Sequence, residues 1–248
     1  MTQKPRGRRR KLPGQQVRGV PLGRALSKLG ILSRSQAIDA IRAGRVRVAG
    51  RVVRDEAALV VPERARLIVD GIAGRAPLWR TIVFHKPRGV VTTRRDPEGR
   101  PTVFDVLGDA GRGLIAVGRL DLATSGLLLL TSDTRLADWI TDPAHDVPRL
   151  YVVTVRGRVE ARDLADLTGA VTTLRKASSR ESHLLVELRE GRNRQVRRMF
   201  DAIGHEVTKL KRVRLGGLEL GDLAPGQHRD VLRAEISTAF PGAPLREV

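Results

Sequence analysis

The stretch GRLDLATSGLLLLTSD, residues 118–133, brings the carboxylate of Asp121 and the guanidinium of Arg119 to the start of a run of four leucines. A continuous apolar run of this length, with a glycine before it and a Ser-Asp pair after it, predicts a strand that is buried on both faces. A carboxylate beside such a strand is unfavourable unless it is paired or hydrogen-bonded. We therefore expect Asp121 to have a dedicated basic partner.

Candidate partners lie downstream in EGRNRQVRRMFDAIGHEV, residues 190–207. Asn193 can cap a helix that Gly204 ends and whose apolar stripe is Val196, Met199, Phe200 and Ile203. Arg197 falls at the border of this stripe, where its guanidinium could hold a carboxylate in two-point geometry. The same segment carries three further arginines, Arg192, Arg194 and Arg198. Four arginines this close also fit a phosphate-facing patch or a solvated face, so the residues alone leave the pairing with Asp121 open.

Other polar residues give no support for metal or thiol chemistry. The chain has no cysteine, which excludes disulfides, thiol nucleophiles and thiolate metal sites. Its five histidines are scattered without metal-ligand spacing, so the sequence predicts no metal site. We interpret three aspartates as caps of turns or helices, namely Asp105, Asp133 and Asp142. Taken by themselves, Tyr151 fits a strand residue with a hydrogen-bonded hydroxyl, and Leu215 fits a core residue.

The charge of the chain points to a polyanionic partner. Its 248 residues include 46 Lys and Arg against 27 Asp and Glu, a net charge of +19. The excess is uneven, because residues 1–54 contain 15 of the basic residues and a single acid, Asp39. This balance favours nucleic acid as the partner over a merely soluble basic surface.

Residues 1–16 are expected to form a disordered basic arm. They show no periodicity and have almost no large apolar side chains, so they cannot bury enough surface to offset the entropy of ordering. Such an arm is either a solvated extension or a phosphate-binding segment. No apolar run approaches the about 20 residues that cross a bilayer, and no apolar core follows the basic start. We therefore expect a soluble, cytoplasmic protein without a signal peptide.

Two helices and a hairpin are predicted after the arm. The first helix ends at Gly30 and has the apolar stripe Leu22, Ala25, Leu26 and Leu29. The second opens with the capping box of Ser33 and Gln36, closes at Gly44, and carries Ala37, Ile38 and Ile41. Residues 45–53, RVRVAGRVV, alternate apolar and basic side chains on both sides of an Ala-Gly pair. That alternation predicts a short hairpin with one basic face.

The segment GILSRSQAIDAIRAGRVRVAGRVV resembles the alpha-L RNA-binding motif first recognised in a small-subunit ribosomal protein. The resemblance covers about residues 17–65 and implies an RNA-binding domain. Ala49 stands where the motif usually has Asn, a departure that affects the hairpin turn more than the RNA-facing surface. The resemblance implies RNA contacts by Arg34, Arg42, Arg45 and Arg47. A plain helical hairpin with a charged surface is the alternative.

Residues 66–78, RLIVDGIAGRAPL, finish a strand and then become small and Gly/Pro-containing, which predicts a linker. A second domain is expected over residues 79–248. Its first apolar run ends at Lys86-Pro87 and resumes at Val90-Val91, so it predicts a strand, a turn and a second strand.

Several motifs of the second domain resemble the RsuA/RluB-like family of ribosomal RNA pseudouridine synthases. GRLDLATSGLLLLTSD matches the catalytic signature of that family. The resemblance extends over about residues 80–235 through HKPRGVV, TVFDVL, RLYVVTV, EGRNRQVRRMF and LKRVRLGGLELGDLAPGQHR. The alpha-L domain is the usual N-terminal domain of this family. The resemblance implies an α+β fold with a mostly antiparallel central sheet and an active site in a basic cleft across it.

The resemblance also implies roles for individual residues. Asp121 would be the catalytic aspartate, and Arg119 the wedge that enters the RNA stack and supports the flipped nucleotide. Tyr151 would pack on the target base and remove the proton from the new carbon–carbon linkage. Arg197 would form the ion pair with Asp121, and Leu215 would pack beneath the base. RNA contacts by the remaining arginines of that segment are expected from Arg192, Arg194 and Arg198.

The implied activity is site-specific isomerisation of uridine to pseudouridine in ribosomal RNA, free or in a pre-ribosomal particle, by a monomer. We favour the large-subunit (23S) RNA because the motif set and the basic extension most resemble RluB. Exchange of a carbon–nitrogen for a carbon–carbon bond has no net redox change, so no metal or other cofactor is expected. Extruding a stacked base costs a few kcal/mol, which phosphate contacts must offset. The alternatives are a non-catalytic RNA-binding or ribosome-assembly protein, and a metal-dependent nuclease using Asp121, Asp133 and Asp142.

Overall fold

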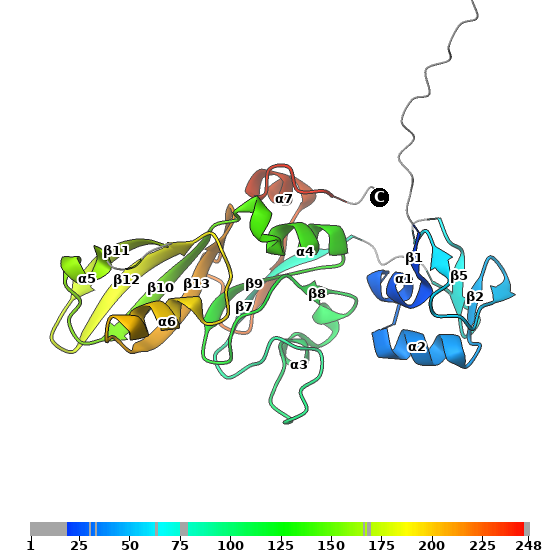
Figure 1. Ribbon diagram of the computed structural model, residues 1–248, viewed down its shortest axis with the longest axis horizontal. Helices are drawn as coiled ribbons and strands as arrows, with labels where there is room; N and C mark the ends of the chain where they lie inside the picture. The colour runs from blue at the N-terminus through cyan, green and yellow to red at the C-terminus, as the bar shows by residue number, and fades with distance from the viewer. Residues whose placement is uncertain are drawn as a thin grey trace, which may run out of the picture. The chain divides into compact units, whose positions relative to one another are not determined.

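The computed structural model describes residues 19–245 except residues 30, 33, 63, 75–78, 166, 168 and 169. The chain divides into two compact units, Met1–Ala76 and Pro77–Val248, whose elements are labelled in Figure 1. The basic arm predicted for residues 1–16 lies outside the described residues. Within the described ranges, no helix has the length and apolar content that a membrane span requires.

The N-terminal unit packs two helices against short strands. Both helices are close to their predicted positions, α1 at Leu22–Lys28 and α2 at Arg34–Arg42. The four residues of the first predicted stripe are all buried, which confirms that stripe. The predicted end at Gly30 and cap at Ser33 fall on residues that are not described. The strands are β1 (Val20–Pro21), β2 (Val46–Val48), β3 (Arg51–Val52), β4 (Leu59–Val60), β5 (Leu67–Val69) and β6 (Ile72–Gly74).

The predicted hairpin is confirmed, and the strand expected at the start of residues 66–78 is β5, but Ile72–Gly74 forms a strand where a linker was predicted. Strands β2 and β3 pair antiparallel across Ala49-Gly50, with φ of 49° and 84°. Residues 67–74 form β5 and β6, which join this hairpin in a sheet of order β3-β2-β5-β6. The Asp70-Gly71 pair also has positive φ and makes a second tight turn rather than starting a linker. Residues 75–78 of the predicted linker are not described.

The second unit is built on one mixed sheet, so the α+β fold predicted from the sequence is confirmed. In the described residues nine strands join this sheet, with the order β11-β12-β10-β13-β9-β7-β15 and with β8 and β14 beside β9 and β13. Each neighbouring pair is antiparallel except β9 and β13. The strands are β7 (Thr81–Lys86), β8 (Ile115–Ala116), β9 (Ser125–Thr131), β10 (Arg149–Arg156), β11 (Ala170–Ala177), β12 (Glu181–Leu188), β13 (Val207–Leu215), β14 (Leu218–Glu219) and β15 (His228–Asp230).

One predicted strand of this unit does not form. Val90-Val91 makes no strand, and Val91 contributes only an isolated bridge to Thr102. The reason is local, because Gly89 turns the chain at φ 78° and sends it along residues 101–103 instead of back into the sheet.

The leucine run forms the centre of the sheet as β9, and it is buried on both faces as predicted. Leu128 and Leu130 pack into one hydrophobic cluster with Phe84, whereas Leu127 and Leu129 pack into a second one. The first cluster is covered by α3 (Val103–Leu107), α5 (Ala161–Ala165) and α6 (Gln195–Ala202), and the second by α4 (Thr134–Thr141) and α7 (Arg233–Ala239). Alternation of side chains along one strand thus supplies two cores.

Gly126 allows the unusual parallel contact between β9 and β13. It pairs with Arg212 and has φ 111°, and a Cβ at this position would lie 2.2 Å from the Arg212 carbonyl oxygen. No other residue fits so close to the neighbouring backbone. The glycine therefore fixes where the segment before β9 meets β13.

Candidate active site

A cleft of about 530 Å³ opens where the loop before β9 meets the ends of β10 and β13 and the loop before α6. Its lining includes four of the five predicted catalytic residues, Arg119, Asp121, Tyr151 and Leu215. Arg192 and Arg194 also line it. Residues from four separate segments of the sequence are thus brought together, as the motif analysis requires.

The loop that carries Asp121 is held by its backbone. Each carbonyl oxygen of residues 120–124 accepts a hydrogen bond, and four of the five donors come from outside the loop. The pairs, in order along the loop, are Leu120 with Thr92 Oγ1 (2.9 Å), Asp121 with Thr124 N (3.0 Å), Leu122 with Gly89 N (2.8 Å), Ala123 with Arg197 Nη2 (3.2 Å) and Thr124 with Lys86 Nζ (2.9 Å). This arrangement preorganises the loop, and with it the position of the Asp121 side chain.

Lys86 lies beside the Asp121 loop and was not singled out by sequence reasoning. Its side chain is fully buried, and its ammonium group donates to the carbonyl oxygens of Pro87 and Thr124, each at 2.9 Å. Burial lowers the pKa of Lys86 to about 8, while the nearby Asp121 carboxylate acts in the opposite direction. The only sequence signal was a lysine at the end of an apolar strand, and the pairing of Lys86 with Gly126 that brings it to the loop is visible only in the sheet.

Arg197 supports the loop rather than forming the direct ion pair predicted with Asp121. Its side chain is 9% exposed and donates to the carbonyl oxygens of Val207 (2.8 Å) and Ala123 (3.2 Å). No ion pair joins Arg197 to Asp121 in the described chain, so the prediction of a direct pair is wrong for this structure. Burial lowers the pKa of Arg197, and the Asp121 charge is near enough to oppose that shift. Arg197 and Lys86 therefore provide a positive field for Asp121 without touching its carboxylate.

The helix that carries Arg197 begins one residue later than predicted. The residue that caps α6 is Arg194, in the left-handed conformation with φ 49°, and not Asn193. Gly204, with φ 79°, follows the end of α6 as predicted. The left-handed turn directs the chain so that Arg192 and Arg194 lie exposed at the cleft, while Arg198 is exposed on α6 and does not line it.

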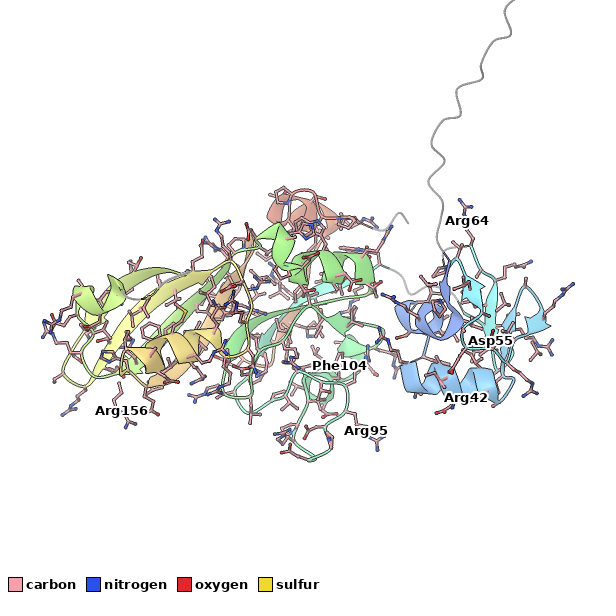
Figure 2. The ribbon with its side chains drawn as sticks, in the orientation of Figure 1. Arg42, Asp55, Arg64, Arg95, Phe104 and Arg156 are labelled. Atoms are coloured by element: carbon pink, nitrogen blue, oxygen red, sulfur yellow. The ribbon has the colours of Figure 1, made fainter. Side chains whose placement is uncertain are left out.

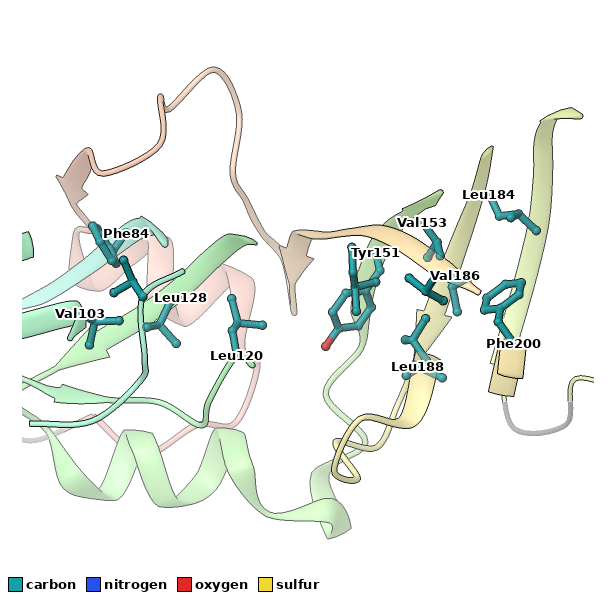
Figure 3. Packing of buried hydrophobic residues seen from close by; sticks show 14 of the residues in the cluster. Phe84, Val103, Leu120, Leu128, Tyr151, Val153, Leu184, Val186, Leu188 and Phe200 are labelled. Carbon is teal, nitrogen blue, oxygen red and sulfur yellow. The ribbon is translucent and has the colours of Figure 1, made fainter. Parts of the chain in front are cut away.

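Tyr151 and Leu215 form the apolar wall of the cleft. Tyr151 is 9% exposed and belongs to the same cluster as Leu120, which precedes Asp121. Figure 3 shows its ring between Leu120 and Leu188, with the hydroxyl oxygen on the side of Leu120. Leu215 is 2% exposed and packs in the second cluster while it also lines the cleft.

Two further buried arginines line the cleft, and sequence reasoning did not single them out. Arg149 donates to the carbonyl oxygens of Val147, Arg189 and Ile140 at 2.8, 3.0 and 3.3 Å. Burial lowers the pKa of Arg149, Tyr151 opposes this, and the neighbouring positive charge of Arg212 adds to it. Arg212, opposite Tyr151 in the sheet, donates through Nε to the Leu127 carbonyl oxygen at 2.8 Å.

The aspartates interpreted as structural do act as caps. Asp105 forms a capping box with Thr102, Asp133 accepts from the first turn of α4, and Asp142 accepts from the Ala144 backbone. The described residues contain no group of three or more His, Cys, Asp and Glu side chains that could hold a metal ion. Asp133 and Asp142 therefore have local partners of their own, which leaves the nuclease alternative without a ligand set in this part of the chain.

Comparison with known proteins identifies both units. The family model described as RNA pseudouridylate synthase matches residues 80–202, and the S4 domain model matches residues 20–64. An "Uncharacterized RNA pseudouridine synthase" of Aquifex aeolicus is 33% identical over 92% of this chain and 97% of its own length. The chain belongs to the RNA pseudouridine synthase family.

Two further relatives of this pseudouridine synthase carry more specific names. "Ribosomal large subunit pseudouridine synthase B" of Escherichia coli K12 is 38% identical, covering 80% of this chain and 74% of that protein. The Bacillus subtilis protein of the same name is 34% identical, covering 87% and 93%. A solved "pseudouridylate synthase" superposes with a TM-score of 0.60 at 28% identity, covering 88% of this chain and 98% of that one. The mixed sheet and the two-domain order are therefore those of the family.

The S4 domain of this synthase carries its basic residues on the surface. All four predicted RNA contacts are exposed: Arg34, Arg42, Arg45 and Arg47. Arg42 pairs with Glu56 at 3.2 Å and Arg45 with Asp70 at 2.9 Å, in solvent-exposed pairs that compete weakly with an RNA phosphate. Figure 2 shows Arg42 and Arg64 among the side chains that project from this domain.

Proposed function

We propose that this chain isomerises a uridine of large-subunit ribosomal RNA to pseudouridine, with Asp121 as the catalytic carboxylate. The names of the relatives in Escherichia coli and Bacillus subtilis support the substrate. The observation that carries the catalytic assignment is the Asp121 loop, whose five successive carbonyls are held while Asp121 lines the cleft. An active-site carboxylate needs this kind of fixed support.

The reaction exchanges one bond for another. The bond between C1′ of the ribose and N1 of uracil breaks, a bond between C1′ and C5 forms, C5 loses a proton and N1 gains one. Asp121 acts on the target nucleotide while the first bond breaks, and Tyr151 accepts the C5 proton. Leu215 and the Tyr151 ring hold the base between apolar surfaces. No electron is gained or lost, and we propose no cofactor.

The target base must leave its stack before any of these groups can reach it. Arg119 is exposed at the cleft beside Gly118, which turns the chain at φ 71°. We assign Arg119 the role of the wedge that takes the place of the extruded base. Arg192, Arg194 and Arg198 contact phosphates of the same RNA, which offset the few kcal/mol of unstacking.

Asp121 has to be ionised to act as nucleophile or base. Two cations, Lys86 and Arg197, are held beside its loop and supply positive charge close to the reacting nucleotide. The proposed partner is ribosomal RNA, either free or in a pre-ribosomal particle. The S4 domain binds this RNA through its exposed arginines. We propose that the enzyme acts as a cytoplasmic monomer.

The test is to map pseudouridines in ribosomal RNA at nucleotide resolution with the wild-type chain and with Asp121→Asn. The wild type should form pseudouridine at one position, and Asp121→Asn should form none while binding the RNA as well as the wild type. Asp109→Asn, a change in a side chain that is 91% exposed, is the matched control and should be fully active. Product from Asp121→Asn would overturn the catalytic assignment. A wild type that binds RNA without forming product would favour the non-catalytic alternative.

A further inference from the structure

The wall of the cleft contains a buried cation that the fold does not neutralise. Arg212 is 4% exposed, and its Nε donates to the Leu127 carbonyl oxygen. Its Nη2 has no hydrogen-bond partner among the described residues, and no carboxylate of that part of the chain forms an ion pair with it. A buried guanidinium without a counter-charge is one of the most costly arrangements in a folded protein.

Arg149 shows what a structural arginine looks like in the same cleft. It is 8% exposed, close to the burial of Arg212, but three backbone carbonyls accept hydrogen bonds from its two terminal nitrogens. Its guanidinium fastens the start of β10 to the neighbouring loops. Arg212 makes only one such bond among the described residues. Holding the backbone therefore does not explain why a charged side chain is buried at this position.

A second unpartnered group lies on the same wall. The Thr124 side chain is 2% exposed, lines the cleft, and its Oγ1 has no partner in the described chain. Thr124 directly precedes β9, in which Gly126 pairs with Arg212. The two groups therefore belong to adjoining segments of one wall, near Asp121.

We infer that Arg212, assisted by Thr124, is a substrate-binding residue that receives an oxygen of the extruded nucleotide. This inference rests on the proposed function and adds to it a contact that neither the motifs nor the ion-pair argument assigned. The chemistry required is an oxygen that carries negative charge or a strong dipole, which a guanidinium and a hydroxyl both bind as donors. In a uridine nucleotide of RNA, we consider two sources of that oxygen, the phosphate of the target nucleotide and a uracil carbonyl.

The first experiment compares Arg212→Met with Arg149→Met in the full chain. Arg212→Met should lower the single-turnover rate of pseudouridine formation by roughly 100-fold, the size expected for loss of one preorganised donor. Its melting temperature should stay within a few degrees of the wild type, because a costly buried charge leaves with the side chain. Arg149→Met should instead lower the melting temperature strongly, because three backbone carbonyls lose their donor, and should change the rate less than Arg212→Met does. Thr124→Val should slow the reaction by several-fold.

Two modified substrates decide which oxygen is bound. A neutral methylphosphonate at the target nucleotide removes the phosphate charge, and a thio-substituted uracil weakens one carbonyl acceptor. The substitution that removes the true partner should slow the wild type and leave Arg212→Met unchanged. A rate within about twofold of the wild type for Arg212→Met, or a melting temperature that falls as in Arg149→Met with both substrate effects retained, overturns the inference.

Failure of the proposed function has a different signature. It appears as a wild type that forms no pseudouridine in any ribosomal RNA. In that case the role of Arg212 is decided by RNA binding. The affinity of Arg212→Met for the same RNA is measured by fluorescence anisotropy, with Arg112→Gln as the exposed-arginine control. Several-fold weaker binding supports the contact, and unchanged binding overturns it.

Discussion

The surface of the S4 domain and the support of the Asp121 loop in the catalytic domain use positive charge in opposite ways. The arginines of the S4 domain lie in solvent, and the side chains of Arg42 and Arg45 are 67% and 49% exposed. The cations that hold the Asp121 loop are buried, from Lys86 at 0% to Arg197 at 9% exposed, whereas Arg192 and Arg194 lie exposed at the cleft. The first set has acidic partners on the surface, whereas the second set is occupied mainly with backbone carbonyl oxygens. Exposed arginines are thus free to meet a phosphate, as we propose for both domains, whereas the buried cations hold the backbone of the Asp121 loop.

The difference has an energetic basis. A surface ion pair contributes about 0–1 kcal/mol and is screened by salt, so an exposed arginine can exchange its acidic partner for an RNA phosphate at little cost. A buried cation loses its hydration and costs several kcal/mol unless its donors are satisfied. The catalytic domain accepts that cost at the loop of Asp121, where a fixed field is useful. Changes to buried cations should therefore alter chemistry, and changes to exposed ones should alter salt-dependent binding.

Substitution of Lys86 by methionine should have the largest effect. The change removes the donor to Thr124 and the positive charge near Asp121, so single-turnover pseudouridine formation should fall by about 10²–10³-fold. RNA affinity should stay within about twofold, because Lys86 is shielded from solvent. Lys176→Met, on the exposed surface of β11, is the control and should be active. A Lys86→Met protein that is folded and fully active would show that the buried cation serves no catalytic purpose.

The pH dependence of the single-turnover rate should also reveal the ammonium group of Lys86. Lys86 loses its proton near pH 8, so the rate should decline to a plateau roughly tenfold lower as pH rises through that value. Its pKa is lower in the folded chain than the ordinary 10.5, so the unfolded chain binds more protons between about pH 8 and 10.5, and this group makes stability rise with pH there. Unfolding through Lys86 therefore cannot explain the decline.

Lys86→Arg is the variant that tests this assignment. A guanidinium keeps its charge throughout the range, so the step near pH 8 should disappear from the profile of single-turnover rate against pH. Persistence of the step in a folded Lys86→Arg protein would assign it to another group.

Much of this organisation could be predicted from the sequence. The strand of Leu127–Leu130 was recognisable because no polar side chain interrupts it, and the caps at Asp133 and Asp142 because capping is a local interaction. The motif set pointed to residues that line one cleft, since Asp121 precedes β9, Tyr151 lies near the start of β10 and Leu215 ends β13. Local patterns and their order along the chain were sufficient for these features.

Other features depend on long-range register, which a single sequence does not reveal. Arg197 was expected to reach the Asp121 carboxylate, but the turn at Arg194 and the contact with Val207 direct it to the Ala123 carbonyl instead. Lys86 becomes a buried neighbour of the loop only because β7 pairs with β9. Strand β6 was mistaken for part of a linker, because tight turns and linkers are both rich in glycine.

Exposed arginines of the S4 domain should give an effect on binding alone. The double substitution Arg42→Gln and Arg47→Gln should weaken RNA binding by several-fold. It should also make the slope of log affinity against log salt shallower, by about 0.7–0.9 for each phosphate that these two side chains neutralise. The single-turnover rate at saturating RNA should not change. Binding measured by anisotropy over a range of salt concentrations tests this, with Arg112→Gln in the catalytic domain as control. An unchanged slope would show that these arginines do not contact phosphates.

The smallest expected effect concerns Ala49, which stands at the turn of the S4 hairpin with φ 49°. An alanine in the left-handed region is strained, whereas asparagine adopts it readily and Asn-Gly favours this type of hairpin turn. Ala49→Asn should therefore stabilise the S4 domain by about 0.5–1 kcal/mol in urea unfolding of the full chain. Ala57→Asn, at an exposed position where φ is not positive, should give no gain. Because the turn affects folding and leaves the charges in place, the salt slope of RNA binding should be the same in Ala49→Asn and wild type, which separates the stability of this domain from its electrostatic role.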